Sequence, residues 1–376
     1  MTRTATNDRT GMLAVAPWIG LGAAALAGAL YGLEPRDTEP SPIGPRHLEM
    51  VASIERGETR VDRIQMCFVP GTPEPVITAF IEAVDRAAPD RYQQTNRWSG
   101  PIATGDAGDE GDPITLTYSF VPDGTGIENG IGEGFGNSAL FAKFDGIYGN
   151  TQTWQDLFHE VFDRWEDVSG LNYIYEPNDD GATMFSAPGV LGVRGDLRIG
   201  AKVLDGSSGV LAYNNFPNGG DMVLDSADNF YNDTTQNSRR LRNVVSHEHG
   251  HGMGQLHNCP ILGAKLMEPF VNTSFDGPLH DDVRNAQDMY GDIAEPNDSA
   301  GAALDIGTIT MGDTADPGRI TPTIGTTSGL CLNERSSPPF TNDEDCYRFS
   351  TPPEGTFPTE PPPPRSRYHA NHQPCR

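Results

Sequence analysis

The chain can be interpreted outward from residues 247–257, His247-Glu-His-Gly-His-Gly-Met-Gly-Gln-Leu-His257. His247 and His251 are four residues apart, so on a helix their side chains share one face and can bind one ion. Glu248 is offset by one position, close enough to contact a water on the metal without being a ligand. Gly254 has no Cβ and leaves helical geometry at little cost, so the chain can turn and return His257 as a third ligand. Three neutral imidazoles leave the fourth tetrahedral position open, which indicates a catalytic zinc.

The alternative for this stretch is a surface helix that is simply rich in histidine. His249 fits that alternative, because it lies between the ligands on another face, and no role is assigned to it. The whole chain has only 9 histidines, so the spacing of the other three favours a zinc site over chance.

Composition narrows the class of protein. The chain has 376 residues, enough for two modest domains plus processing segments, and a net charge of −26. That charge argues against a nucleic-acid partner. A content of 43 Gly and 31 Pro indicates a loop-rich, β-containing protein. The five cysteines include no C-x-x-C pair, so cysteine-based zinc or thioredoxin chemistry is not indicated.

The N-terminus resembles a targeting segment. Residues 12–33 are nearly all apolar and follow a polar start that carries Arg3 and Arg9. Residues 1–29 are therefore predicted to be a secretory signal peptide, cut after Ala27 or Ala29. An uncleaved membrane anchor is the alternative. Both interpretations place the rest of the protein outside the cytoplasm, secreted or anchored.

Residues 30–112 are predicted to be a pro-segment or an N-terminal extension. Residues 34–46 are Pro-rich and read as a linker, residues 77–88 have helical spacing, and residues 100–112 are rich in Gly and Asp. Cys67 has two interpretations: a pro-segment thiolate at the open zinc position, or, as we favour, a disulfide partner or an inert thiol.

A folded domain that contains the three histidines is predicted over residues 113–292. Alternating β-rich residues predict strands, and one stripe of apolar residues predicts a helix at 154–169. The predicted strands are residues 114–120, 171–175, 196–200, 209–216 and 221–224. Asn237 or Ser238 is expected to cap the helix that carries the histidines. The fold class is α/β (α+β): a mixed twisted sheet with two long helices and a C-terminal helix.

Met267 follows the third histidine by ten residues, and with the zinc motif it resembles the metzincin metalloendopeptidases, in which a methionine turn lies under the zinc. Within them, residues 113–291 resemble the matrixins, most clearly in Thr115-Leu-Thr-Tyr118 and Gly195-Asp-Leu-Arg-Ile-Gly200. The resemblance implies a secreted zinc endopeptidase that hydrolyses internal bonds of proteins or peptides, with Glu248 as general base. It also implies substrate contacts, by strand addition along an edge strand and in a side-chain pocket. The substrate residues that the resemblance implies are Val210, Leu211, Ala212 and Phe270.

The resemblance also has consequences for metals. Matrixins usually hold a second, structural zinc partly through histidines, and the corresponding residues here are Tyr213 and Val223, so one zinc is predicted. Calcium-ligand positions of the family carry carboxylates, which suit Ca²⁺, although an acidic surface loop would look the same. These positions are Asp205, Asp225 and Asp228, with Asp196 and Asp221 as weaker candidates. The Pro-Arg-Cys-Gly pro-segment motif of the family is absent.

Residues 293–351 resemble bacterial pre-peptidase C-terminal domains, which are small β-sandwiches. The resemblance rests on residues 295–299 and 343–350 and covers too few residues for a whole domain, so a partial β-sandwich is expected. Cys331 and Cys346 could pair in an oxidising compartment. Residues 352–376, with Pro361–Pro364, are predicted to be a disordered tail.

Two other functions remain open at this point. One is a non-catalytic, zinc-containing extracellular binding or adhesion protein, against which the presence of Glu248 argues. The other is a metal-dependent hydrolase of non-peptide amide bonds, which the sequence leaves open.

Overall fold

The computed structural model describes residues 43–60, 63–87, 96–258, 263–297, 300–309 and 346–350. The predicted signal peptide, Cys331 and the Pro-rich tail lie outside these residues. Within them, no helix combines the length and apolar character needed to cross a membrane.

A six-stranded mixed sheet forms the centre of the fold. Its strand order is β1-β7-β8-β6-β2-β5. The strand β7 runs antiparallel to both of its neighbours, whereas β8, β6, β2 and β5 are mutually parallel. The bounds are β1 Ile64–Phe68, β2 Ile114–Phe120, β5 Leu171–Tyr175, β6 Leu197–Lys202, β7 Val210–Asn215 and β8 Met222–Asp225. A short ribbon of β3 (Gly126–Ile127) and β4 (Gly136–Asn137) stands apart from this sheet.

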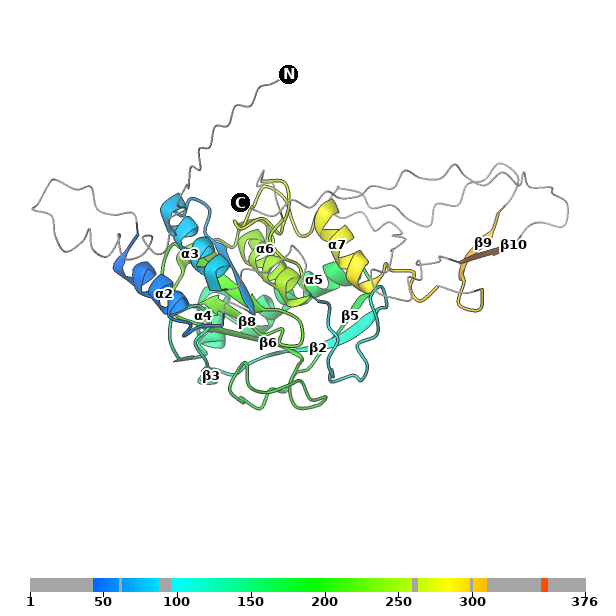
Figure 1. The fold of residues 1–376 in the computed structure, drawn as a ribbon. Helices are drawn as coiled ribbons and strands as arrows, with labels where there is room; N and C mark the ends of the chain where they lie inside the picture. The colour runs from blue at the N-terminus through cyan, green and yellow to red at the C-terminus, as the bar shows by residue number, and fades with distance from the viewer. Residues whose placement is uncertain are drawn as a thin grey trace, which may run out of the picture. The chain divides into compact units, whose positions relative to one another are not determined.

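One face of the sheet is covered by helices that share the larger hydrophobic cluster, with α5 (Thr151–Glu166) next to α6 (Thr235–Gly252) in Figure 1. Asn150 caps α5 by accepting a hydrogen bond from the backbone N–H of Thr153. The buried side of α5 is the apolar stripe that the sequence spacing predicts: Trp154, Leu157, Phe158, Val161, Phe162 and Trp165. Three further elements contribute side chains to this cluster: α4 (Leu140–Tyr148), α7 (His280–Tyr290) and the 3-10 turn η1 (Asn229–Asn232).

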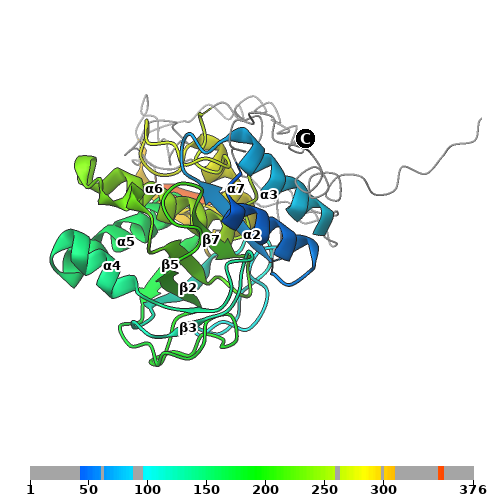
Figure 2. The ribbon, with the colours of Figure 1, turned by 90° about the vertical axis from the view of Figure 1, so that its left-hand side faces the viewer.

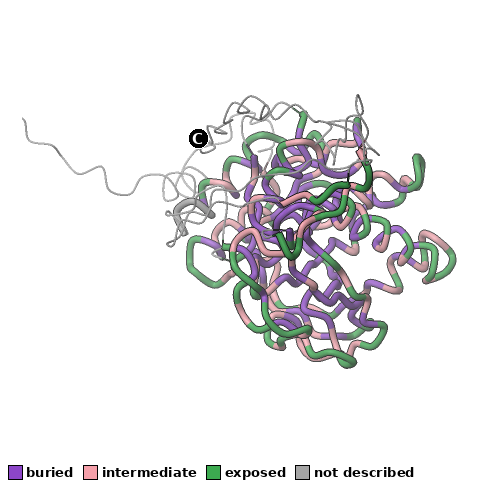
Figure 3. Tube along the Cα trace, turned by 90° about the vertical axis from the view of Figure 1, so that its right-hand side faces the viewer, coloured by how far each residue is buried: buried purple, intermediate pink, exposed green. Residues whose placement is uncertain are grey.

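A second hydrophobic cluster lies on the other face of the sheet. It joins α2 (Pro45–Glu55), α3 (Glu74–Ala87) and β1 to side chains of the central strands such as Val210 and Val223. Figure 2 shows α2 and α3 side by side, and Figure 3 shows buried chain running through the interior of the fold. Residues 43–60 and 63–87 thus belong to the packed core of the described structure.

Most predicted elements are confirmed, and the differences lie near the N-terminus. The mixed α/β fold, the five predicted strands, the helix at 154–169 and the C-terminal helix are present. Residues 45 and 46, predicted to be linker, begin α2, and β1 has no counterpart in the prediction. Gln236, Asn237 and Ser238 have left-handed φ angles of 54–55°, so regular helix begins only after them.

The C-terminal region is described only in part. The strands β9 (Leu304–Thr308) and β10 (Tyr347–Ser350) pair in parallel. Cys346 is a free thiol, and its predicted partner lies outside the described residues. The partial β-sandwich therefore stays a prediction.

Candidate active site

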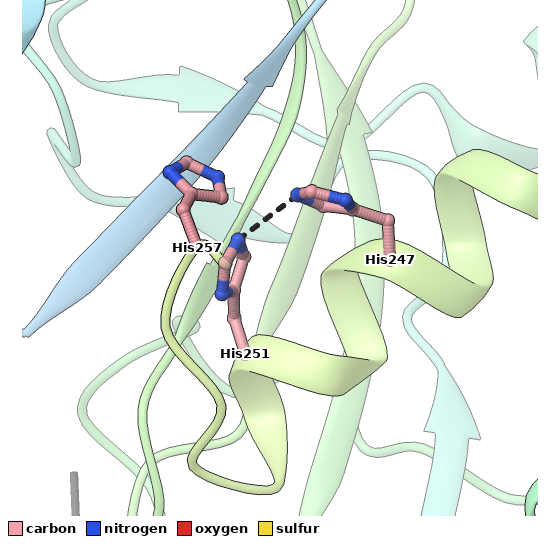
Figure 4. A group of neighbouring side chains, drawn as sticks. All are labelled: His247, His251 and His257. Atoms are coloured by element: carbon pink, nitrogen blue, oxygen red, sulfur yellow. Dashed lines mark hydrogen bonds between the residues drawn. The ribbon is translucent and has the colours of Figure 1, made fainter. Parts of the chain in front are cut away.

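Three histidines meet at the end of α6 (Figure 4). His247 and His251 are fully buried in the last two turns of the helix. The helix ends at Gly252, and Gly254 has a φ of +114°, which places His257 opposite the helix. One nitrogen of each ring lies within 4.8 Å of the others, and together they form a group that could hold a metal ion.

Hydrogen bonds fix which nitrogen of each helical histidine faces this group. His247 Nδ1 lies 2.7 Å from the carbonyl oxygen of Leu266, and His251 Nδ1 lies 2.8 Å from that of Gln255. A carbonyl only accepts, so both Nδ1 atoms donate and both Nε2 lone pairs point inward. Burial lowers the pKa of His247 to about 4, which keeps its ring neutral and able to bind a cation.

The donor set fits zinc. The two Nε2 atoms are 3.0 Å apart, and two lone pairs at that separation need a proton or a cation between them. Tetrahedral zinc with Zn–N bonds of about 2.0–2.1 Å sets its ligand nitrogens about 3.3 Å apart. The predicted ligands thus converge as the sequence spacing requires.

Met267, ten residues after His257, is fully buried. It packs against Gly250, where a Cβ would come within 2.3 Å of the Met267 sulfur. A side chain at 250 would therefore displace the methionine. The position of Met267 agrees with the predicted methionine turn.

Asp282 holds this turn in place and was missed by sequence reasoning. Its buried carboxylate accepts hydrogen bonds from the backbone N–H groups of Leu266 (2.8 Å), Met267 (3.1 Å) and Leu279 (2.9 Å). The carbonyl oxygen of Leu266 accepts the hydrogen bond from His247, so Asp282 influences the orientation of that histidine indirectly, by holding Leu266. The only sequence feature that could have pointed to Asp282 is its position in the first turn of α7, where acidic residues are favoured.

Glu248 is fully buried beside the three histidines. Within the described part of the chain its two carboxylate oxygens have no well-aligned hydrogen bond. The thiol and backbone of Cys67 nevertheless lie close enough to lower its pKa, against the larger effect of burial, which raises that pKa to about 8. Cys67 is itself a free, fully buried thiol whose pKa is raised by burial and by Glu248, so the disulfide interpretation of this cysteine was wrong.

His249 is a buried core residue, so its assignment to an exposed, histidine-rich helix surface was wrong. Its Nε2 pairs with the hydroxyl of Tyr173, and its ring packs on Phe162 with centroids 4.9 Å apart. Burial lowers its pKa to about 3.

The C-terminal end of α6 is anchored from two distant segments. Trp98 donates its indole N–H to the Gly252 carbonyl (2.9 Å), and Tyr290 donates its hydroxyl to the Met253 carbonyl (2.6 Å). The Tyr290 hydroxyl also accepts from the backbone N–H of Trp98 (3.0 Å). These bonds satisfy carbonyls that a helix end leaves without partners.

Comparison with known families supports the zinc site. Residues 147–291, less than half of the chain, match the Matrixin family of peptidases. These residues are a matrixin-like metzincin domain. No curated protein matches the chain. The family consists of zinc metalloendopeptidases that act on proteins or peptides, so the matrixin-like domain indicates a zinc metallopeptidase.

Three of the four expected substrate residues of the matrixin-like domain lie on β7, which packs against α6. Val210, Leu211 and Ala212 are fully buried in β7. The strand β7 is not the edge of the sheet, because β1 pairs with it from Ile64↔Asn215 to Phe68↔Val210. Phe270 also pairs with β1, through a bridge to Phe68. The expected edge strand is therefore already covered.

The matrixin-like domain has no histidine at the two positions associated with a structural zinc. The hydroxyl of Tyr213 donates to Glu133 (2.8 Å), and Val223 is part of the second hydrophobic cluster. Lys202 forms a buried ion pair with Glu133 (2.7 Å) and donates to the carbonyl oxygens of Glu128 and Gly134 (both 2.8 Å). A lysine ammonium thus holds together the loop over residues 127–134.

The carboxylates predicted for calcium gather around one loop. Asp225 accepts from the backbone N–H groups of Asp205 and Gly206, and Asp228 accepts from that of Ser208. Asp205 accepts from the backbone N–H of Val210 (2.9 Å) and pairs with His47 (2.8 Å). These bonds order the loop, and calcium here stays a prediction.

The two weaker calcium candidates act as structural acceptors. Asp196 accepts from the backbone N–H groups of Ala103 and Thr117. Asp221 accepts from those of Phe185 (2.7 Å) and Arg198 (3.2 Å). Burial raises the pKa of Asp221 from 3.8 to about 7.

We expect Asp221→Asn to change the pH dependence of stability. A carboxyl whose pKa is raised by folding stabilises the fold fully below its unfolded pKa, and that contribution is lost as pH rises through about 7. The free energy of unfolding of the wild type, minus that of the variant, should therefore fall between pH 4 and pH 7.5. Urea unfolding at matched zinc content measures it. A difference independent of pH would contradict the expectation.

Proposed function

We propose that the chain is a zinc-dependent endopeptidase that hydrolyses internal peptide bonds, with Glu248 as its general base. The observation that carries the proposal is the placement of Glu248 on α6 between two inward-facing histidines, within a matrixin-like domain. His247, His251 and His257 are the proposed ligands.

The proposed chemistry divides between the metal and the chain. When bound, zinc supplies Lewis acidity, which activates water near neutral pH and polarises a carbonyl. Glu248 takes the proton of the attacking water and passes it to the leaving amine. The Nδ1 bonds of His247 and His251 hold the ligand rings in place, and Met267 packs against Gly250 of the same helix.

The same proposal extends to the substrate, the compartment and calcium. Phe270 would contact a side chain next to the cut bond, and residues 210–212 of β7 would pair with an extended peptide only at an edge that β1 does not occupy. Secretion is supported by the apolar residues 12–33 and calcium by Asp205, Asp225 and Asp228.

We expect about one zinc per chain in the purified protein, because the described structure brings together one histidine group with inward-facing nitrogens. Plasma emission spectrometry after dialysis against metal-free buffer measures the ratio. A ratio near two would show that Tyr213 and Val223 were misread.

Digestion of an unbiased peptide library tests the activity itself. Cleavage of internal bonds that is lost with a chelator and restored by zinc supports an endopeptidase. A zinc-loaded protein that leaves peptides intact but hydrolyses small amides would indicate the hydrolase of non-peptide bonds. Zinc without any turnover, in a form whose active site has been shown to be accessible, would indicate a binding protein.

A further inference from the structure

His249 lies on the side of α6 that faces away from the proposed zinc ligands. Successive residues of a helix are about 100° apart, so His249 is about 180° around the helix from the mean direction of His247 and His251. The residue is 1% exposed, and its ring centroid is 4.9 Å from that of Phe162 and 6.4 Å from that of Trp165, both on α5. An apolar side chain would fill this place, so a buried imidazole needs a polar partner to offset its loss of water.

That partner is the hydroxyl of Tyr173, which pairs with Nε2 of His249. Burial lowers the pKa of His249 to about 3 and raises that of Tyr173 well above its ordinary value, so both groups are neutral and one hydrogen bond joins them. The two rings also pack edge to face, with centroids 5.1 Å apart. The strand β5 is thereby joined directly to α6.

Tyr173 is itself held at three points. Its backbone N–H donates to the carboxylate of Glu166, the last residue of α5. Within β5 it is in register with Leu116 of the neighbouring strand β2, and its ring centroid lies 4.9 Å from that of Phe162. The hydroxyl is therefore fixed relative to both the sheet and α5.

We propose that Tyr173 and His249 are positioning residues for the metal site, because their hydrogen bond fixes the rotation of α6 about its own axis. Through the helix backbone it then sets the directions in which His247 and His251 present their nitrogens and Glu248 presents its carboxylate. The effect on metal binding stands on the histidine group alone, whereas the effect on hydrolysis rests on the proposed function.

A small rotation of α6 is enough to disturb zinc binding. An atom about 6 Å from the helix axis moves by about 1 Å when the helix turns by about 10°. Zinc–ligand distances tolerate changes of only about 0.2 Å. Apolar contacts allow such a turn because they are not directional, whereas a hydrogen bond weakens steeply as its angle closes. The bond to Tyr173 therefore restricts a motion that packing alone permits.

The first experiment compares Tyr173→Phe with Tyr118→Phe in the full-length protein. Tyr118 is the matched control, because its hydroxyl pairs with Nδ1 of His159 on α5, in the same aromatic cluster but not with α6. Tyr173→Phe should weaken zinc binding about tenfold, the lower end of the effect of losing a partner that orients metal ligands. The kcat for peptide hydrolysis should fall about tenfold at unchanged KM. Tyr118→Phe should change none of these quantities.

A second measurement reads the metal site without using activity. The visible absorption of Co²⁺ bound in place of zinc depends on the arrangement of its ligands. Tyr173→Phe and His249→Leu should both shift this spectrum, and Tyr118→Phe should leave it as in the wild type. His249→Gln keeps a polar group within reach of the Tyr173 hydroxyl, so its spectrum should lie closer to that of the wild type than the spectrum of His249→Leu.

The double variant Tyr173→Phe with His249→Leu separates positioning from stability. Neither position then leaves a buried polar group without its partner, so the urea midpoint should recover most of the loss that Tyr173→Phe alone causes. The cobalt spectrum, the zinc affinity and kcat should nevertheless stay altered. The double variant also provides the test if Tyr173→Phe alone does not fold.

The alternative is that the contact contributes only to core packing. A double variant with both the stability and the cobalt spectrum of the wild type would show this and overturn the proposal. Equal changes in Tyr173→Phe and Tyr118→Phe would also overturn it, because they would reflect a loosened aromatic cluster. If zinc affinity and the cobalt spectrum change as expected but no form hydrolyses peptides, the positioning role stands and the proposed peptidase function fails.

Discussion

Glu248→Gln is expected to lower kcat/KM for peptide hydrolysis by roughly 10²–10⁴-fold, the range typical of a lost general base. The amide keeps the size of the side chain but cannot take a proton from water. The zinc ligands are untouched, so zinc content should stay at the wild-type ratio. Initial rates with a fluorogenic peptide and plasma emission spectrometry measure the two quantities.

A matched control is Glu160→Gln on the exposed side of α5, which keeps its length and removes one charge away from the site. Its rates should match those of the parent protein. Glu248→Gln protein that keeps full activity would remove Glu248 from the mechanism. Loss of both zinc and activity would instead assign Glu248 a structural role at the metal site.

Lys202→Met is expected to lower the free energy of unfolding by about 3–5 kcal/mol, the usual cost of removing one partner from a buried ion pair. The side chains of Lys202 and Glu133 are 3% and 0% exposed, so Glu133 would stay buried without its cation. The hydroxyl of Tyr213 would still donate a hydrogen bond to Glu133, which limits the loss of stability. Urea unfolding of the zinc-loaded protein measures it.

The double variant Lys202→Met with Glu133→Gln should regain part of this stability, because the uncompensated charge is then gone. Arg240→Met serves as control, since its pair with Asp233 is largely solvated, and should shift the urea midpoint little. If Lys202→Met were as harmless as Arg240→Met, the ammonium would not be what holds residues 127–134.

The sequence was informative where one periodicity dominates. The helix at 154–169 and strand 114–120 were predictable because each has a regular apolar pattern. The apolar residues of both patterns are buried, although in the strand the intervening Thr117 and Ser119 are buried too. The strand β1 was not predicted, because Ile64-Gln-Met-Cys-Phe68 is a short apolar run without alternation, and it is buried by α2 and α3 on one side and α6 on the other. Such a strand is defined by tertiary contacts.

The candidate site was also predictable only where a local sequence pattern determines it. The ligands were predictable because the spacing within residues 247–257 already encodes a helix face and a turn. The partners that orient them were not, since Leu266 contributes a backbone carbonyl and Asp282 contributes acceptors from another helix. Backbone atoms carry no residue signature, so their roles become visible only in three dimensions.

The bonds at the end of α6 bear on where a catalytic fragment can begin. Trp98 reaches the carbonyl of Gly252 from well before residue 113, the boundary that the sequence suggests. A fragment starting at residue 113 would leave this carbonyl buried without its donor and the Tyr290 hydroxyl without one of its partners. Proteolytic trimming that preserves the helix end must therefore stop before Trp98, which makes residues 96–112 part of the smallest intact catalytic unit.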